Sequence, residues 1–212
     1  MISKVVTGAK KYIDNIIVVD DGSEDPTHTL AQGAGAFVIR HNRNLGKGMA
    51  LRTGFSYALQ NGFDAVITLD ADGQHDPAEI GNFLSELNSN PGDIIIGTRF
   101  WKKTPIPMYR YIPNRIGIFC ISKAAGCRID DTQSGFRLYK REVLNSVRLE
   151  TEGFETETEI LIKAGKMGFR ICSLPVSAVY HDDYKTHFRP VRDFYRISIL
   201  VLKLSFFRGK DN

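Results

Sequence analysis

Two aspartates that follow a short apolar run have the types and spacing of a metal site. Asp70 and Asp72 come directly after residues 65–69, and side chains two positions apart on an extended backbone point to the same side. Mg²⁺ and Mn²⁺ prefer hard oxygen ligands, and Mg²⁺ is commonly held by one or two carboxylates plus substrate phosphates. We expect this pair to bind Mg²⁺ or Mn²⁺ with a phosphate-bearing ligand, and Gln74 and His75 could complete or orient the set. The alternative is a solvated acidic turn.

A second pair, Asp20 and Asp21, ends the apolar run of residues 16–19. A carboxylate at this place in a nucleotide-binding sheet commonly receives ribose hydroxyls or a base N–H. We therefore expect the pair to contact a nucleoside. The alternative is a turn in which an aspartate caps the next helix.

Basic residues accompany both pairs, as a phosphate ligand would require. Lys47 lies in the segment 44–48, which lacks the complete phosphate-loop pattern. The weaker expectation is that flexible backbone at a helix N-terminus brings Lys47 to a diphosphate, and a simple helix start is the alternative. Arg99 follows another apolar run, with Arg115 and Arg137 in the segments after it. These arginines can neutralise a leaving diphosphate or bind an acceptor phosphate; for Arg115 and Arg137 surface ion pairs are the alternative.

Two glutamates, Glu155 and Glu157, stand before a stretch with helical spacing. One of them could act as a general base or position an acceptor. Charge at the entry to a helix is the simpler account of both.

Alternating strands and helices must position these residues. Over residues 1–98 this alternation predicts an α/β fold, a mostly parallel sheet with flanking helices, whose ligands bind beyond the carboxyl ends of the strands. After Thr98 three prolines break the pattern, and we expect that stretch to cover the sheet edge and shape an acceptor site. The expected strands are 16–19, 36–40, 65–69, 94–96 and 169–174, and the expected helices are 1–13, 26–33, 46–59, one after Asp76, and 154–165.

The length of 212 residues fits one domain with a buried core. We divide it into a nucleotide-sugar-binding half (1–98), an acceptor-side half (99–190) and a basic amphipathic C-terminal segment (191–212). The net charge of +4 and the absence of nucleic-acid-binding signatures favour phosphate groups or an anionic membrane surface over nucleic acid. Three cysteines without close pairing indicate neither a disulfide framework nor structural zinc.

No apolar run is long enough to span a membrane, which needs about 20 residues. We therefore expect a cytoplasmic protein. Residues 191–207 could lie in a membrane interface, as a peripheral contact on its cytoplasmic face, or pack on the core.

In combination, six segments resemble family 2 glycosyltransferases with the fold called GT-A, in particular the branch of dolichyl-phosphate mannose synthase. They stand in the family's order and cover residues from about 1 to 190. The segments are Val18-Val19-Asp20-Asp21-Gly22-Ser23, Asn44-Leu45-Gly46-Lys47-Gly48, Asp70-Ala71-Asp72-Gly73-Gln74-His75, Ile96-Gly97-Thr98-Arg99, Asp131-Thr132-Gln133-Ser134-Gly135-Phe136-Arg137 and Phe154-Glu155-Thr156-Glu157-Thr158-Glu159.

The resemblance implies an inverting transfer of a hexose from a GDP- or UDP-sugar, most simply to a polyprenyl phosphate such as dolichyl phosphate. It implies a metal held by Asp70, Asp72 and Gln74, and catalytic roles for Asp72, Arg99 and Arg115. The donor would contact Val19, Asp20, Asp21, Lys47, Asp70, Ala71 and Gln74.

One departure from the family pattern leaves a second function open. The family's first strand, which lies in the middle of its sheet and ends in a nucleotide-binding loop, has no counterpart in residues 1–16. A protein that binds a nucleotide-sugar without transferring it is therefore the alternative. A nucleotidyltransferase shares the sheet architecture but needs a glycine-rich loop after the first strand.

Overall fold

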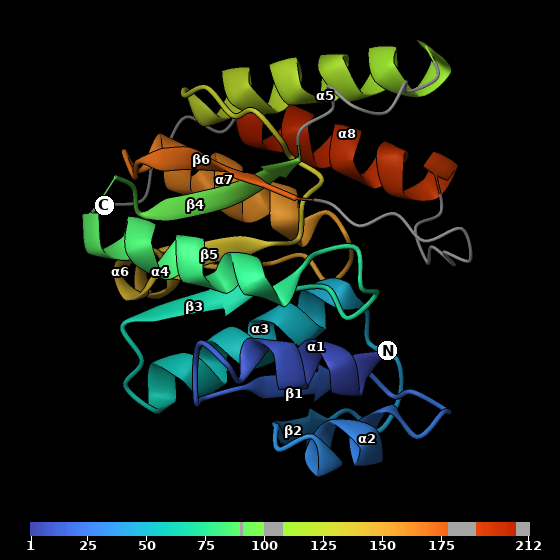
Figure 1. The fold of residues 1–212 in the computed structure, drawn as a ribbon. Helices are drawn as coiled ribbons and strands as arrows, with labels where there is room; N and C mark the ends of the chain where they lie inside the picture. Colours follow the sequence, from blue (N-terminus) through green and yellow to red (C-terminus); the bar gives the residue numbers. More distant parts are fainter. Residues whose placement is uncertain (90, 100–107, 178–189, 207–212) are drawn as a thin grey trace.

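The strands form two separate sheets, and helices flank both (Figure 1). The computed structural model describes residues 1–89, 91–99, 108–177 and 190–206. The strands are β1 (Ile17–Asp20), β2 (Phe37–Arg40), β3 (Ala65–Thr68), β4 (Ile94–Arg99), β5 (Arg137–Lys140) and β6 (Ile171–Val176). The helices are α1 (Ile2–Ala9), α2 (Thr27–Gly33), α3 (Lys47–Gln60), α4 (Ile80–Ser89), α5 (Met108–Ala125), α6 (Arg141–Ser146), α7 (Thr156–Lys166) and α8 (Pro190–Phe206), and a 3₁₀ turn, η1 (Pro77–Glu79), precedes α4.

The smaller sheet pairs β1 with β2 in parallel, in register from Ile17 opposite Phe37 to Asp20 opposite Arg40. Helices α1 and α2 pack on it because their small or apolar side chains fall on one face, where Val6 and Ala31 are buried. This sheet places the first aspartate pair at its carboxyl end.

The larger sheet has the strand order β3-β5-β4-β6. Strands β4 and β6 are parallel, whereas β5 runs antiparallel between β3 and β4. The α/β prediction is confirmed, but β5 was not among the expected strands. Its insertion is what brings the loop before β5 next to the end of β3.

The sheets are interrupted between β1 and β3. Within the residues that the structure describes, β1 pairs only with β2, and β3 pairs only with β5. All four residues of β3 remain partly exposed, whereas residues 94–97 of β4 are buried. The interruption lies in the middle of the set of strands. In the family that the sequence resembles, the first strand is expected at this position.

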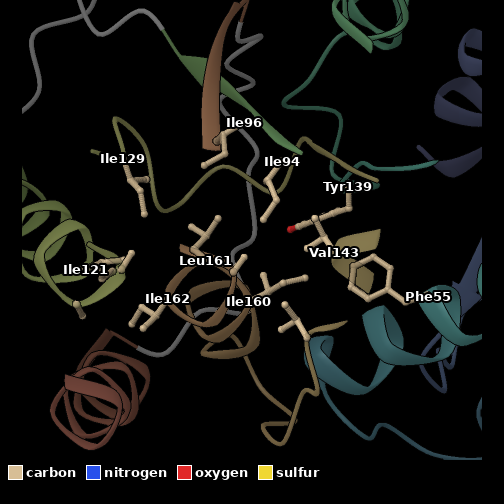
Figure 2. Close-up of a cluster of buried hydrophobic side chains, with 14 residues drawn as sticks. Phe55, Ile94, Ile96, Ile121, Ile129, Tyr139, Val143, Ile160, Leu161 and Ile162 are labelled. Carbon is tan, nitrogen blue, oxygen red and sulfur yellow. The ribbon is translucent and has the colours of Figure 1, made fainter. Parts of the chain in front are cut away.

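The main core lies against the larger sheet and joins it to α3, α5 and α7. Figure 2 shows Tyr139 of β5 facing Phe55 of α3, with ring centroids 5.2 Å apart, while Leu161 of α7 and Ile121 of α5 fill the other side. Aromatic pairs in this geometry stabilise beyond their buried area. This core fixes the start of α7, which carries part of the site described below.

The expectation that prolines break the chain after Thr98 is wrong for Pro113, which lies inside α5. A proline removes one helical hydrogen bond, and here packing of α5 against α7 and α8 outweighs that loss. Pro105 and Pro107 lie outside the described residues. Residues 190–206 form helix α8.

Candidate active site

Lys47, the first residue of α3, joins the end of β3 to the start of α7. Its Nζ lies 2.9 Å from Oδ1 of Asp70 and 2.9 Å from Oε2 of Glu157. It also lies 3.2 Å from Oδ2 of Asp70 and 5.7 Å from the centroid of the Phe154 ring. The structure thus brings together two predicted residues, Lys47 and Asp70, and adds Glu157 as a second carboxylate partner.

The environment of Lys47 keeps its ammonium protonated. Burial by itself would lower the pKa of Lys47, but the charges of Glu157 and Asp70, and the hydrogen bonds to them, raise it above the ordinary lysine value. The side chain of Asp70 is 33% exposed, so solvent and ligands reach this carboxylate. A fixed positive charge therefore sits against an accessible aspartate.

Asp72 lies on the turn after β3, two residues beyond Asp70. Its Oδ1 accepts the backbone N–H of Gln74 at 2.9 Å, and Gly73 between them has a φ of 78°, where glycine is favoured. Asp72 and Gln74 are both partly exposed. The hydrogen bond orients the Asp72 carboxylate on the same turn as Asp70.

The donor set suits a metal that is completed by its substrate. In the described ranges, no cluster of three or more His, Cys, Asp or Glu side chains could hold a metal ion. Two accessible carboxylates, Asp70 and Asp72, fit the habit of Mg²⁺, which is often bound through one or two carboxylates plus phosphate oxygens. The residues present therefore fit a metal that arrives with a phosphate ligand.

A buried arginine organises the loop before β5. The guanidinium of Arg137 donates to the backbone carbonyls of Thr132 (2.9 Å), Ser134 (2.6 Å) and Glu157 (2.8 Å). Asp131 accepts the N–H of Ser134 at 3.2 Å. Arg137, one of the arginines considered for phosphate binding, is fully buried and instead ties this loop to α7.

That loop packs directly on Asp70. Thr68 donates its hydroxyl to the carbonyl of Gly135 at 2.8 Å. A Cβ added to Gly135 would lie 2.3 Å from Oδ2 of Asp70. A larger residue here would displace the Asp70 carboxylate from this position, so Gly135 is a site residue that residue chemistry alone did not reveal.

The first aspartate pair holds loops of the protein itself. Asp21 accepts the N–H groups of Leu45 (2.9 Å) and Gly46 (2.8 Å), and its Oδ1 lies 2.6 Å from Nδ1 of His41. Asp20 is buried, accepts the N–H of Ser23 at 2.9 Å and pairs with Arg40 at 3.3 Å. Asp21 therefore fixes the loop that carries Lys47.

The same loop is held from the other side by the segment before α7. Met49 donates its N–H to the carbonyl of Glu152 at 3.2 Å. A Cβ added to Gly48 would lie 2.0 Å from Oγ1 of Thr156 and 2.6 Å from the carbonyl carbon of Glu152. The segment 44–48 is thus clamped between β1 and α7.

The other predicted residues are less closely gathered. Val19 lies in β1 and faces α3, and Ala71 is exposed on the turn between Asp70 and Asp72. Arg99 is the last residue of β4, and its side chain lies outside the described part of the chain. Arg115 is exposed on α5. Burial raises the pKa of Asp130, but hydrogen bonds from Ser173 and Arg128, together with the charge of Arg115, lower it below its ordinary value.

The glutamates at the start of α7 have different roles. Glu157 binds Lys47, whereas Glu155 is buried and pairs with Arg196 of α8 at 3.6 Å. Glu159 accepts three N–H and O–H donors from Glu150 and Thr151 and pairs with Lys163 at 2.6 Å. Their alternation along the sequence was the only signal, and it could not tell which one faces the site.

Comparisons with known proteins agree on one family. The sequence model described as Glycosyl transferase family 2 matches residues 1–148. The chain is 30% identical over 205 residues to a UDP-N-acetylglucosamine–dolichyl-phosphate N-acetylglucosaminyltransferase of Methanococcus voltae, covering 85% of this chain and 81% of the relative. It is 28% identical over 175 residues to a polyprenol monophosphomannose synthase of Mycolicibacterium smegmatis, covering 77% and 66%.

The fold is also similar to that of solved structures. One is a glucosyl-3-phosphoglycerate synthase from Mycobacterium tuberculosis, determined with Mn²⁺, UDP-glucose and phosphoglyceric acid. The TM-score is 0.72 and the identity 18%, over 96% of this chain and 74% of that one.

Proposed function

Because the chain belongs to glycosyl transferase family 2, we propose that it transfers a hexose from a nucleotide-diphospho-sugar to a polyprenyl phosphate. The observation that carries the proposal is the accessible pair Asp70 and Asp72 at the end of β3, with Lys47 beside it. The names of the relatives from Methanococcus voltae and Mycolicibacterium smegmatis support the acceptor class.

The site supports a donor diphosphate at the end of β3. Asp70 and Asp72 would hold Mg²⁺ or Mn²⁺, which supplies positive charge to the diphosphate when it is bound. Lys47 adds a fixed positive charge to the same place. Asp20 and Asp21 shape the nucleoside end by fixing the loops around residues 23 and 45, and Arg99 and Arg115 are proposed for the phosphate groups of donor and acceptor.

Transfer would be a single displacement with inversion. An oxygen of the acceptor phosphate forms a bond to the anomeric carbon while the bond from that carbon to the donor diphosphate breaks. The acceptor oxygen is already ionised, so no strong general base is needed, in accord with the engagement of Glu157 by Lys47. Positioning and charge stabilisation then account for most of the catalysis.

Helices α5 and α8 offer a surface for the lipid acceptor. They lie side by side, and their exposed apolar side chains include Phe119 (67% exposed), Tyr195 (66%) and Leu202 (58%). Exposed Arg192 and Lys203 on α8 add positive charge, as in helices that lie on anionic membranes. No helix among the described residues is long and apolar enough to cross a membrane. We assign to this face a peripheral membrane contact.

The test is a transfer assay with polyprenyl phosphate, GDP-mannose, UDP-glucose or UDP-N-acetylglucosamine, and Mn²⁺ or Mg²⁺. Asp72→Ala is expected to lower transfer at least about 100-fold, as removal of charge stabilisation typically does. Asp64→Ala is the matched control, because Asp64 lies just before the other end of β3 and its side chain is fully exposed. Equal activity of wild type and Asp72→Ala would refute the metal role.

The interruption between β1 and β3 favours a second candidate, binding of a nucleotide-sugar without transfer. Calorimetric titration with GDP and UDP in the presence of Mn²⁺ separates the two. Binding without turnover of any donor would favour the second candidate. Turnover that depends on Asp72 would exclude it.

A further inference from the structure

The Lys47 ammonium lies against both carboxylate oxygens of Asp70, where a metal ion bound by this aspartate would also stand. Resting on the function proposed above, we infer that this lysine makes metal binding depend on the donor: a divalent ion binds weakly alone and tightly together with a diphosphate. The new element is the role of Lys47, whose charge sets how strongly metal binding depends on the donor.

Lys47 and a divalent metal ion compete for the carboxylate of Asp70. The Lys47 ammonium lies within 3.2 Å of both oxygens of Asp70, and the other candidate ligand, Asp72, already accepts a backbone N–H. A divalent ion at Asp70 would therefore stand close to a fixed positive charge, and like charges a few ångströms apart repel strongly in a partly buried site. Metal alone gains little from this aspartate.

The backbone around Lys47 is held from two sides, so movement of its loop cannot carry the ammonium away from Asp70. Asp21 accepts two N–H groups of the segment 44–48, and the carbonyl of Glu152 accepts the N–H of Met49 on the other side. The close approach of Gly48 to Thr156 leaves no space for that segment to shift toward α7. The backbone of Lys47 is therefore fixed.

Glu157 keeps its ion pair with the Lys47 ammonium when Asp70 binds a metal ion. Its Oε2 lies 2.9 Å from Nζ, and its side chain is only 9% exposed. The Arg137 guanidinium donates to the backbone carbonyl of Glu157 and holds this residue in place. Metal and ammonium then stand side by side, and a donor diphosphate supplies the negative charge that both require.

The experiment measures the Mn²⁺ dissociation constant by electron paramagnetic resonance, without nucleotide and with saturating GDP or UDP. In wild type, nucleotide is expected to tighten Mn²⁺ binding, within the range of about 5- to 150-fold typical of coupled sites. In Lys47→Met, Mn²⁺ alone is expected to bind about tenfold tighter than in wild type, and the gain from nucleotide is expected to shrink. Lys47→Arg keeps the charge and is expected to behave as wild type.

The matched control is Lys163→Met. Lys163 is 20% exposed and pairs with two carboxylates, Glu159 and Glu150, as Lys47 (22% exposed) pairs with Asp70 and Glu157. Its loss removes a similar ion-pair cluster away from the turn after β3 and should leave the Mn²⁺ affinity unchanged. If Lys47→Met does not fold, Lys47→Gln, whose amide can still donate to Glu157, is the second neutral variant.

The outcomes separate this inference from the function on which it rests. Mn²⁺ affinities of wild type and the neutral Lys47 variants that agree within twofold, with nucleotide still tightening both, would overturn the coupling role of Lys47 alone. Absence of Mn²⁺ binding by wild type even with GDP and UDP would overturn the coupling and the proposed metal site together. Tighter binding of Mn²⁺ alone in the neutral variants, but not in Lys163→Met, supports the inference.

Discussion

The strands differ in how completely they are buried, even within the larger sheet. In β1 and β3 every residue except Asp20 is partly exposed, whereas residues 94–97 of β4 and residues 137–139 of β5 are buried. The chemistry-bearing aspartates follow the partly exposed strands. The buried strands carry the loop of Gly135 and the core that supports α7.

This difference indicates a division between a ligand-contact half, which holds β1, β2 and β3, and a scaffold half, which holds β4, β5 and β6. Elements with fewer buried apolar contacts open more easily, and binding regions are commonly drawn from them. The scaffold half reaches into the other through Glu157 and Gly135, which fix Lys47 and Asp70. The predictions below test whether the halves differ in stability as they differ in burial.

The largest effect is expected in the buried strand β4 of the larger sheet. Ile95 of β4 is 1% exposed and Ile67 of β3 is partly exposed, although both contribute to the same apolar cluster. Ile95→Ala should lower the free energy of unfolding by about 3–4 kcal/mol and Ile67→Ala by about 1–2 kcal/mol, because the former leaves a closed cavity. Urea unfolding measures both. Equal losses would show that the interruption beside β3 does not weaken its packing.

A smaller effect is expected where the halves touch. Gly48→Ala places a methyl group against Thr156 and should lower the free energy of unfolding by about 1–3 kcal/mol, as overpacking does. It should also reduce transfer, because Lys47 must move. Gly54→Ala is the control in the same helix, since within the part of the chain that the structure describes its Cβ would meet only Val19, at 3.6 Å. Full activity of Gly48→Ala would mean that the clamp is unnecessary.

Much of the ligand-contact half could be predicted from the sequence because its strands, turns and helices follow from patterns of neighbouring residues. The runs before Asp20 and Asp70 are β-branched, end in aspartate turns and alternate with helical spacing, so β1 and β3 were placed within a residue. The pairing of Lys47 with Glu157 joins residues 110 positions apart and depends on the packing of α7, which no local pattern encodes.

The scaffold half was predicted less well for a related reason. Strand β5 is four residues long and wholly buried except at its end, so it shows no alternation of polar and apolar residues. Pro113 concealed α5, whose burial against α7 and α8 depends on distant segments. Tertiary packing overrides local propensity in both cases.

An acid-dependent effect of about 1–2 kcal/mol is expected at Glu159, a buried carboxylate of the scaffold half. Burial raises the pKa of Glu159, but hydrogen bonds from Lys163 and Thr151 lower it more, so the folded pKa lies below the unfolded one. The stabilisation is present above the unfolded pKa and is lost as pH falls through the folded one. The difference in unfolding free energy between wild type and Glu159→Gln should therefore shrink from pH 7 toward pH 3.

Unfolding in urea at several pH values measures that difference, and Glu142→Gln, at an exposed residue of α6, is the control. A difference that stays constant down to pH 3 would contradict the assigned ionisation of Glu159. Such a result would mean that the hydrogen bonds of Glu159 stabilise the fold without depending on the charge of its carboxylate.

The smallest effect compares one glycine from each half. Among the described residues, a Cβ added to Gly33 of α2 or to Gly117 of α5 would meet no atom of another part of the chain within 4 Å. Replacement by alanine should stabilise each helix by up to about 1 kcal/mol. If the halves open separately, Gly33→Ala should slow amide hydrogen exchange in β1 and β2 while leaving β4 unchanged, and Gly117→Ala should not protect β1. Equal protection of both sheets by either variant would show instead that the contacts of Lys47 and Gly48 make the halves one cooperative unit.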